Sequence, residues 1–504
     1  MLIFKKKTMK ITIYSKITLG LFLLMITSCQ LTEDLDEFKP LYSLPAESAI
    51  SDQVSADLAL DGMYSALRGA RNSFLYYTML GSMLSGVESG GYFATTVEDV
   101  SLLNNNPVAD GPALGGIYTN LYTLINRANW VIEGAARLSS SDFIDPDRQS
   151  EVINEAKAIR ALGHFYLLRT FGQFYDVSSN YGIVLNLAPA KDSKPRPRNT
   201  VAECYDAILS DLDDAIENAP DLRYKYYTNK TFAKGLKAKV LLYMGDYGNA
   251  AFLAKEVIDN SGPKFQLAAN FEDLFDHIGN TDYLNSVESL FNVYADLDEP
   301  IGGNFWNGIY AQVSNEYYDL GDTGSVTING QTINYDGGRT NFMQQGTPYR
   351  PGFNSNFKFI QSGSLYVYET SYQLRMAEIY LIYAEADARA IKNVSPSALA
   401  ALNTIRIRAG ATSTGSDGFE TYPSNISYEE LLEAIRIEKL MELATEMGED
   451  WYDLVRYDYA DGFGSGFQVS DVKSTATDAE KFIMPIPATS IIAGQNIVKQ
   501  NPGY

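Results

Sequence analysis

Apolar side chains recur every three or four positions over several long stretches of the chain, which is the period of an amphipathic helix. This pattern predicts helices over residues 57–70, 118–137, 151–171, 201–218 and 231–260. Within the last of these, Gly245-Asp246-Tyr247 predicts a turn between two helices, and the small Ala250 allows them to lie close together. The sequence therefore predicts a mainly α-helical protein.

Three more helical runs are predicted between Ser371 and Tyr459, with short breaks between them. Ser427 and Glu430 have the spacing of a capping box at the start of the third run. Gly410 follows the second run and predicts its end. Helices with one apolar face must stack on neighbours to cover that face. The pattern therefore predicts a tetratricopeptide-like array of helical repeats.

Two regions lack the helical period. Residues 71–116 are rich in glycine, serine and asparagine and are predicted to be a loop. Residues 265–369 carry glycines and a strand-like alternation at Ser325-Val326-Thr327-Ile328. A loop-rich insertion of this length is a usual location for function. The predicted organisation is N-terminal repeats over 51–264, the insertion, and C-terminal repeats with a terminal segment over 370–504, all within one unit, 29–504.

The N-terminus has the features of an export signal. Lys5, Lys6, Lys7 and Lys10 form a basic region before an apolar run over residues 17–26, which is shorter than the roughly 20 residues that span a bilayer. Ile26-Thr27-Ser28-Cys29 fits a lipobox, in which small residues precede a cysteine that accepts lipid. We expect a lipoprotein signal peptide over 1–28 and a lipidated, acidic tether over 29–50, anchored without spanning. The alternative is an ordinary secretory signal.

Composition narrows the classes of partner. The net charge of −22 argues against nucleic acid and anionic membrane surfaces, and disfavours a polyanionic glycan. Cys29 and Cys204 are the two cysteines. With Cys29 lipidated, Cys204 has no partner for an internal disulfide, and we expect it to be a small buried side chain.

The sequence contains no P-loop, Gly-x-Ser-x-Gly, His-Glu-x-x-His or EF-hand motif. His164 and His277 are the two histidines, and His164 is expected to pack inside a helix layer. So few histidines and cysteines disfavour a transition-metal site. Among 62 acidic residues no glycosidase pair can be nominated. We therefore predict no catalytic residue, cofactor or metal.

A binding surface for sugar is the remaining hypothesis, because aromatic rings match the apolar faces of sugars while amide and charged groups match their hydroxyl edges. The best candidate is the glycine-rich loop around Trp306, the tryptophan that lies outside the predicted helices. The full set of candidates is Trp306, Phe305, Tyr310, Asn304, Arg339, Asn341, Tyr335, Tyr92 and Phe93. Two alternatives stay open: loop packing for Trp306, and an ion pair with a neighbouring acid for Arg339.

Several segments also resemble one known family. They read RMAEIYLIYAEA, LNTIRIRAG, EMGEDWYDLVR, EAKAIRALGHFYLLRTFGQFYD, YTLINRANWVI and the closing QNPGY. These segments are similar to the SusD/RagB family of surface glycan-binding lipoproteins of the Bacteroidetes starch-utilisation type. The sequence departs from that pattern at Glu449-Asp450, where many relatives carry an arginine, which leaves open whether one helix-end ion pair forms.

The resemblance implies a SusD-like fold and a surface-exposed protein of the outer membrane. It implies binding of an oligosaccharide or polysaccharide and delivery to a SusC-like TonB-dependent transporter, with the helical array facing that transporter. It also implies that aromatic residues of the N-terminal loop and the central insertion contact the sugar. Two other functions are kept as alternatives: a tetratricopeptide-type protein–protein adaptor without a sugar site, and a glycoside hydrolase.

Overall fold

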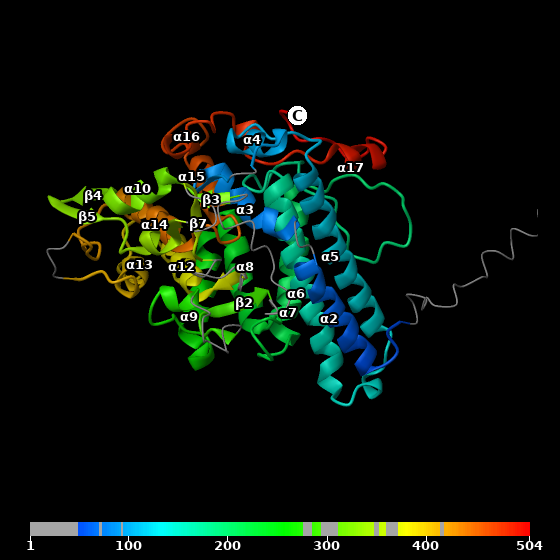
Figure 1. The fold of residues 1–504 in the computed structure, drawn as a ribbon. Coiled ribbons are helices and arrows are strands. Elements are labelled where there is room, and N and C mark those ends of the chain that lie inside the picture. The colour runs from blue at the N-terminus through cyan, green and yellow to red at the C-terminus, as the bar shows by residue number, and fades with distance from the viewer. Residues whose placement is uncertain are drawn as a thin grey trace, which may run out of the picture. The chain divides into compact units, whose positions relative to one another are not determined.

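The computed structural model describes residues 49–69, 73–91, 94–275, 285–293, 311–346, 352–358, 371–413 and 418–504. The chain divides into two compact units, Met1–Ser51 and Asp52–Tyr504, and all described helices and strands belong to the second (Figure 1). The longer helices are α2 (Gln53–Gly69), α3 (Ser73–Ser85), α5 (Pro112–Ala136), α6 (Pro146–Phe171), α7 (Val201–Asn218), α8 (Lys230–Met244), α9 (Tyr247–Asn260), α12 (Met376–Ile391), α13 (Pro396–Arg408), α14 (Tyr428–Leu443) and α15 (Glu449–Ala460). The shorter ones are α4 (Val97–Leu103), α10 (Asn315–Thr323), α11 (Arg339–Met343), α16 (Val469–Val472) and α17 (Ala488–Ala493).

The long helices pack in series. Contacts run from α2 to α5, then through α6, α7, α8 and α9 to α12, which contacts α13 and α14. Helix α14 then contacts α15, and α3 packs against both α5 and α15, so it links the first and last parts of the series (Figure 1). The fold is mainly helical, as predicted, and the paired helices are consistent with tetratricopeptide-like repeats.

Local sequence explains where these helices begin and end. The predicted capping box at Ser427 and Glu430 is confirmed at the start of α14, and Thr200 with Glu203 forms another at α7. Helix α8 ends at Gly245, whose φ of +79° is left-handed and suits glycine. Gly410 likewise follows α13 with a φ of +99°, which confirms the predicted stop.

The strands are short and pair in twos. They are β1 (Glu88–Gly90), β2 (Ser289–Val293), β3 (Ala311–Val313), β4 (Ser325–Ile328), β5 (Gln331–Asn334), β6 (Gln344–Gly346), β7 (Asn354–Asn356) and β8 (Ser371–Arg375). The antiparallel pairs are β1–β3, β2–β8, β4–β5 and β6–β7. The predicted strand at Ser325–Ile328 is confirmed as β4, which turns into β5 through Asn329 and Gly330, both at positive φ.

Three sequence-based expectations were wrong. Residues 371–375 were expected to be helical but form β8, whose positions are buried on both faces and therefore show no alternation. The predicted loop over 71–116 contains α3 and α4. Helix α3 is apolar almost all round and buried from Tyr77 to Ser85, so it lacks an amphipathic period. The insertion over 265–369 contains α10 and α11, which are short helices with little periodic pattern.

Buried ion pairs connect the strands to the C-terminal helices. Arg375, at the end of β8, is fully buried and pairs with Glu288, Glu442 and Glu446 at 2.5–2.6 Å. A second cluster involves Glu449, where the sequence left the helix-end ion pair open. Its carboxylate accepts ion pairs of 2.5 Å from both Arg169 and Lys239, so this helix end is held after all.

Two predictions for single residues hold. Cys204 is fully buried, and its sulfur accepts a hydrogen bond from the backbone N–H of Ile183. His164 is fully buried in α6, and burial lowers its pKa to about 3, so it is neutral inside the protein. Of the helices in the described residues, none combines the length and apolar composition that crossing a bilayer requires.

Candidate functional site

Most of the residues predicted to bind sugar lie outside the described residues. This is true of Tyr92, Phe93, Asn304, Phe305, Trp306 and Tyr310, and also of Cys29 with the signal peptide. Their roles stay predictions. Tyr335, Arg339 and Asn341 belong to the described part of the chain.

Arg339 does not have the geometry of a sugar-binding residue. Its side chain is buried and pairs with Asp336 at 3.3 Å, Glu438 at 2.9 Å and Glu442 at 3.0 Å. Removing a buried guanidinium from these carboxylates to reach a ligand would leave several unpaired charges. The candidate role is therefore corrected, and the alternative kept for Arg339, pairing with neighbouring acids, describes it.

The other two described candidates differ in exposure. Asn341 is exposed, and its side-chain oxygen accepts a hydrogen bond of 2.7 Å from the hydroxyl group of Tyr318. Tyr335 is half-buried and packs against the hydrophobic cluster that contains Val313 and Met343. The structure therefore presents Asn341 to solvent and uses one side of the Tyr335 ring for packing.

The ladder between β1 and β3 brings distant parts of the chain together. Gly90, at the end of β1, is the partner of Ala311, at the start of β3. The segment with Tyr92 and Phe93 begins just after Gly90, and the segment ending at Tyr310 joins β3 at Ala311. The first candidate segment therefore begins, and the second ends, beside two residues that pair with each other in the ladder.

Four amide side chains, here called the amide row, gather where β3 contacts β7: Gln312, Asn315, Gln344 and Asn354. Gln312 donates to the carbonyl of Gly90 at 3.2 Å and accepts from the backbone N–H of Asn354 at 3.1 Å. Gln344 and Asn354 each donate to the side-chain oxygen of Asn315 at 3.4 Å. Asn315 is exposed and the other three are half-buried, so the row faces solvent in part.

Amide groups both donate and accept hydrogen bonds, which is what the hydroxyl groups of a sugar require. No sequence pattern marks the amide row. Its members come from three separate stretches of the insertion and share no common motif. The pairing of β1 with β3 and of β6 with β7 is what assembles them.

Two buried carboxyl groups, those of Glu88 in β1 and of Asp450, lie near each other. Glu88, in β1, is 1% exposed and accepts a hydrogen bond of 3.0 Å from Asn356. Burial raises the pKa of Glu88 to about 8, and the nearby charge of Asp450 acts in the same direction. Burial also raises the pKa of Asp450 to about 6. At neutral pH Glu88 therefore holds its proton.

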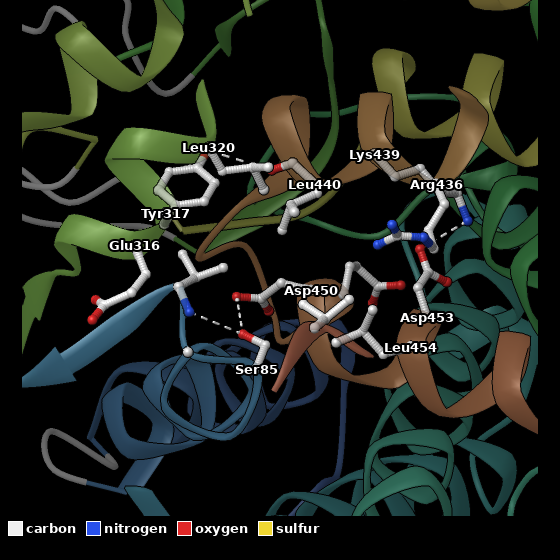
Figure 2. A pocket seen from close by; sticks show the side chains of 14 residues that line it. Ser85, Glu316, Tyr317, Leu320, Arg436, Lys439, Leu440, Asp450, Asp453 and Leu454 are labelled. Atoms are coloured by element: carbon white, nitrogen blue, oxygen red, sulfur yellow. Dashed lines mark hydrogen bonds and ion pairs between the residues drawn. The ribbon is translucent and has the colours of Figure 1, made fainter. Parts of the chain in front are cut away.

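Asp450 lines a pocket of about 90 Å³ between the turn after α3 and helices α10, α14 and α15. Figure 2 shows Asp450 facing Ser85, whose hydroxyl group donates to it at 3.3 Å. The two basic residues that line the pocket pair with acids: Lys439 with Asp453 at 3.0 Å, and Arg436 with Glu433 at 2.5 Å. No group of metal-ligating side chains occurs among the described residues.

Two sequence models of known families match the chain. Residues 304–504 match the model of the SusD family, and residues 78–242 match a SusD-like model described as starch-binding and associating with the outer membrane. A SusD-like protein of Bacteroides ovatus is 27% identical over 388 residues. That match covers 68% of this chain and 65% of the relative, so the chain spans slightly less than two thirds of it.

Solved structures share the fold. A SusD superfamily protein from Bacteroides thetaiotaomicron superposes with a TM-score of 0.72 at 23% identity, over 90% of this chain and 100% of that one. A laminarin-binding SusD-like protein superposes with a TM-score of 0.69 at 21% identity, again over 90% and 100% of the two chains. The two SusD-type models match separate stretches that together make up most of the chain, and they show that it belongs to the SusD-like family.

Proposed function

We propose that this protein is a non-catalytic, surface-exposed lipoprotein of the outer membrane, anchored through lipid on Cys29. It binds an oligosaccharide or polysaccharide and delivers it to a SusC-like TonB-dependent transporter. The sugar lies across the segments around Tyr92 and Trp306 and reaches the amide row. The description of the matching family as starch-binding and the laminarin-binding neighbour both support a glycan as the ligand.

The pairing of Gly90 with Ala311 is the observation that carries this proposal. A sugar-binding surface needs rings for the apolar faces and amides for the hydroxyl groups. The two candidate segments hold the rings in the sequence, and the ladder that joins them also carries Gln312 of the amide row. Both kinds of group are therefore connected to one short sheet.

The expected affinity is modest. A ring that covers one sugar face buries roughly 50–100 Å², which is worth about 1–2.5 kcal/mol. Two or three rings and a few hydrogen bonds, less the cost of ordering the ligand, correspond to a Kd on the order of 10 µM to 1 mM. Such an affinity suits a protein that must release its ligand to a transporter.

The test uses the protein from residue 30 to residue 504 and a panel of polysaccharides that includes starch and laminarin. Affinity electrophoresis and calorimetry measure binding, and release of reducing sugar is measured in parallel. We expect binding to at least one polysaccharide without release. Release that disappears in Asp450→Asn would instead identify a glycoside hydrolase, because Asp450 is a pocket carboxyl group with a raised pKa.

The anchor and the partner have their own test in cells. We expect the full chain to fractionate with the outer membrane and to co-purify with a TonB-dependent transporter, and Cys29→Ala to leave the membrane fraction. Co-purification of the transporter with no binding to any glycan would favour the adaptor function. Membrane association of Cys29→Ala equal to that of the wild type would contradict the lipid anchor.

A further inference from the structure

A second group of aromatic rings lies away from the β1–β3 ladder, in the connection between α7 and α8. Tyr224, Tyr226 and Tyr227 form this group, here called the tyrosine shelf. The shelf borders a cavity of about 310 Å³, at the lower end of the range of roughly 300–1,000 Å³ for ligand pockets. The cavity is lined by Asp61, Tyr64, Ser65, Leu67, Tyr226, Tyr227, Phe291, Asn292 and Val293.

The rings of the shelf are arranged as a platform. Tyr224 and Tyr226 stack with centroids 5.1 Å apart and planes only 6° from parallel. Tyr227 follows at 4.9 Å from Tyr226, tilted by 48°, and meets Tyr64 edge-on at 5.0 Å. The Tyr224 side is open to solvent, because this residue is 52% exposed.

Lys225, the residue between Tyr224 and Tyr226, is buried and fixes this connection to the neighbouring backbone. Its ammonium group donates to the backbone carbonyls of Lys264 at 2.6 Å and Ser289 at 2.7 Å. The backbone N–H of Asn292 donates to the carbonyl of Lys225 at 3.0 Å, which ties the connection to β2. The tyrosines on either side of Lys225 are therefore pre-positioned, and a ligand would not have to order them.

Charged groups at the shelf are also fixed. Arg223 lies over the ring of Tyr227 at 3.9 Å and pairs with Glu155 at 2.9 Å. The hydroxyl group of Tyr227 donates to the exposed carboxylate of Asp61 at 2.9 Å. The exposed carboxylate of Asp61 also lines the cavity, so a hydrogen-bond acceptor adjoins the rings. The hydroxyl group of Ser65 lies nearby but already donates to the carbonyl of Gly62 at 2.8 Å and accepts from Arg127 at 3.1 Å.

We infer that the tyrosine shelf and its cavity form a second glycan-binding site, separate from the surface at β1 and β3, for a neutral segment of the same polysaccharide. The inference rests on the proposed function. Ring faces cover the apolar side of a sugar, while the carboxylate of Asp61 accepts hydrogen bonds from its hydroxyl groups. Asp61 and the net charge of −22 disfavour an anionic sugar. A chain that contacts both sites gains avidity over a short oligosaccharide.

The test measures binding of the polysaccharide found in the panel and of a short oligosaccharide derived from it. The variants are Trp306→Ala, Tyr224→Ala, and Tyr224→Ala combined with Tyr226→Ala. Phe252→Ala is the matched control, because Phe252 is an exposed aromatic residue of α9 outside the shelf, at 62% exposure. Thermal unfolding of each variant checks the fold, and the single Tyr224 change keeps the test valid should the double change unfold the protein.

We expect the shelf variants to weaken polysaccharide binding about tenfold, with Phe252→Ala unchanged. We also expect Trp306→Ala to retain weak binding that the added shelf changes abolish. Shelf variants that bind both ligands like the wild type would overturn this inference and leave the proposed function standing. A wild-type protein that binds no glycan at all would overturn the proposed function, and the shelf assignment with it.

Discussion

The side-chain amide of Asn356 donates a hydrogen bond of 3.0 Å to the buried carboxyl group of Glu88, and so joins β7 to β1. The other oxygen of Glu88 has no hydrogen-bond partner within the described part of the chain. A neutral carboxyl group tolerates this environment, whereas a carboxylate would be poorly solvated. The strand that leads to the Tyr92 segment is therefore sensitive to the protonation of one residue.

Glu88 should make the stability of the protein depend on pH. Its pKa of about 8 in the folded protein lies above the ordinary value of 4.5, so the folded state binds more protons between these two pH values. Its contribution to the free energy of unfolding therefore falls as pH rises from about 4.5 to about 8. We expect Glu88→Gln to be more stable than the wild type at pH 8, by on the order of 2–4 kcal/mol, and nearly equal at pH 4.5.

Urea unfolding at pH 4.5, 6 and 8 measures this difference. Glu316→Gln is the control, because Glu316 is an exposed carboxyl group of α10 at the pocket that Asp450 lines. The control should keep the pH dependence of the wild type. A difference between Glu88→Gln and the wild type that stays constant with pH would mean that Glu88 ionises normally in the folded protein.

Arg375→Ala should strongly destabilise the fold. It leaves Glu288, Glu442 and Glu446 without the guanidinium that pairs with each of them, and breaking such a buried group costs about 3–5 kcal/mol. Lys255→Ala is the control, since its ion pair with Asp259 is about half exposed and should contribute about 0.5 kcal/mol or less. Chemical denaturation measures both, and equal losses would contradict the assigned burial of the Arg375 cluster.

Gly81→Ala should also destabilise, because α3 lies against the residue that precedes α15. A methyl group on Gly81 would lie 2.3 Å from the Cα atom of Gly448, which is backbone and cannot rotate away. We expect a loss of about 2 kcal/mol or more. Gly62→Ala in α2 has open space and should stabilise by about 0.5–1 kcal/mol. Thermal melts of the two variants should therefore shift in opposite directions.

Cys204 should be unreactive in the native protein from residue 30 to residue 504. Burial raises the pKa of its thiol to about 12, and the sulfur is covered. Iodoacetamide at pH 8 should label it in urea and leave it unmodified under native conditions, as measured by mass spectrometry. Labelling of the native protein at the rate of a free thiol would place Cys204 at the surface.

Variants of Trp306 and Trp451 should have different effects: one should change the affinity for glycan and the other the melting temperature. Trp306→Ala should weaken glycan binding by about 1–3 kcal/mol and leave the melting temperature nearly unchanged. Trp451 is fully buried and donates through Nε1 to the carbonyl of Phe482 at 3.1 Å. Trp451→Phe should therefore lower the melting temperature while the glycan Kd stays the same. An equal loss of stability in Trp306→Ala would mean that its ring belongs to the core.

Sequence patterns predicted the helices that have one apolar face and a local start signal. Helix α7 begins and ends at the predicted residues, because Thr200 and Glu203 cap it and its apolar period is clear. The pattern failed for α3 and β8, which are covered on nearly every side, since burial all round removes the contrast between faces. Long-range packing decides these elements, and no short window of sequence contains it.

The same limit applies to the candidate site. The sequence indicated the regions that β1 and β3 connect, but it had no means of finding the amide row, which depends on strand pairing between distant residues. Arg339 looked like a loop residue beside Tyr335, and its partners Glu438 and Glu442 lie far along the chain in α14. Glu88 is one of 62 acidic residues, and only its burial distinguishes it.

The ladder between Gly90 and Ala311 is built from backbone groups, so it places few demands on side-chain identity. Substitutions beyond its ends can exchange one set of rings for another while the helices and the buried ion pairs keep their positions. Under the proposed function, a few substitutions in these segments would change which polysaccharide is preferred, while the scaffold that carries them stays the same.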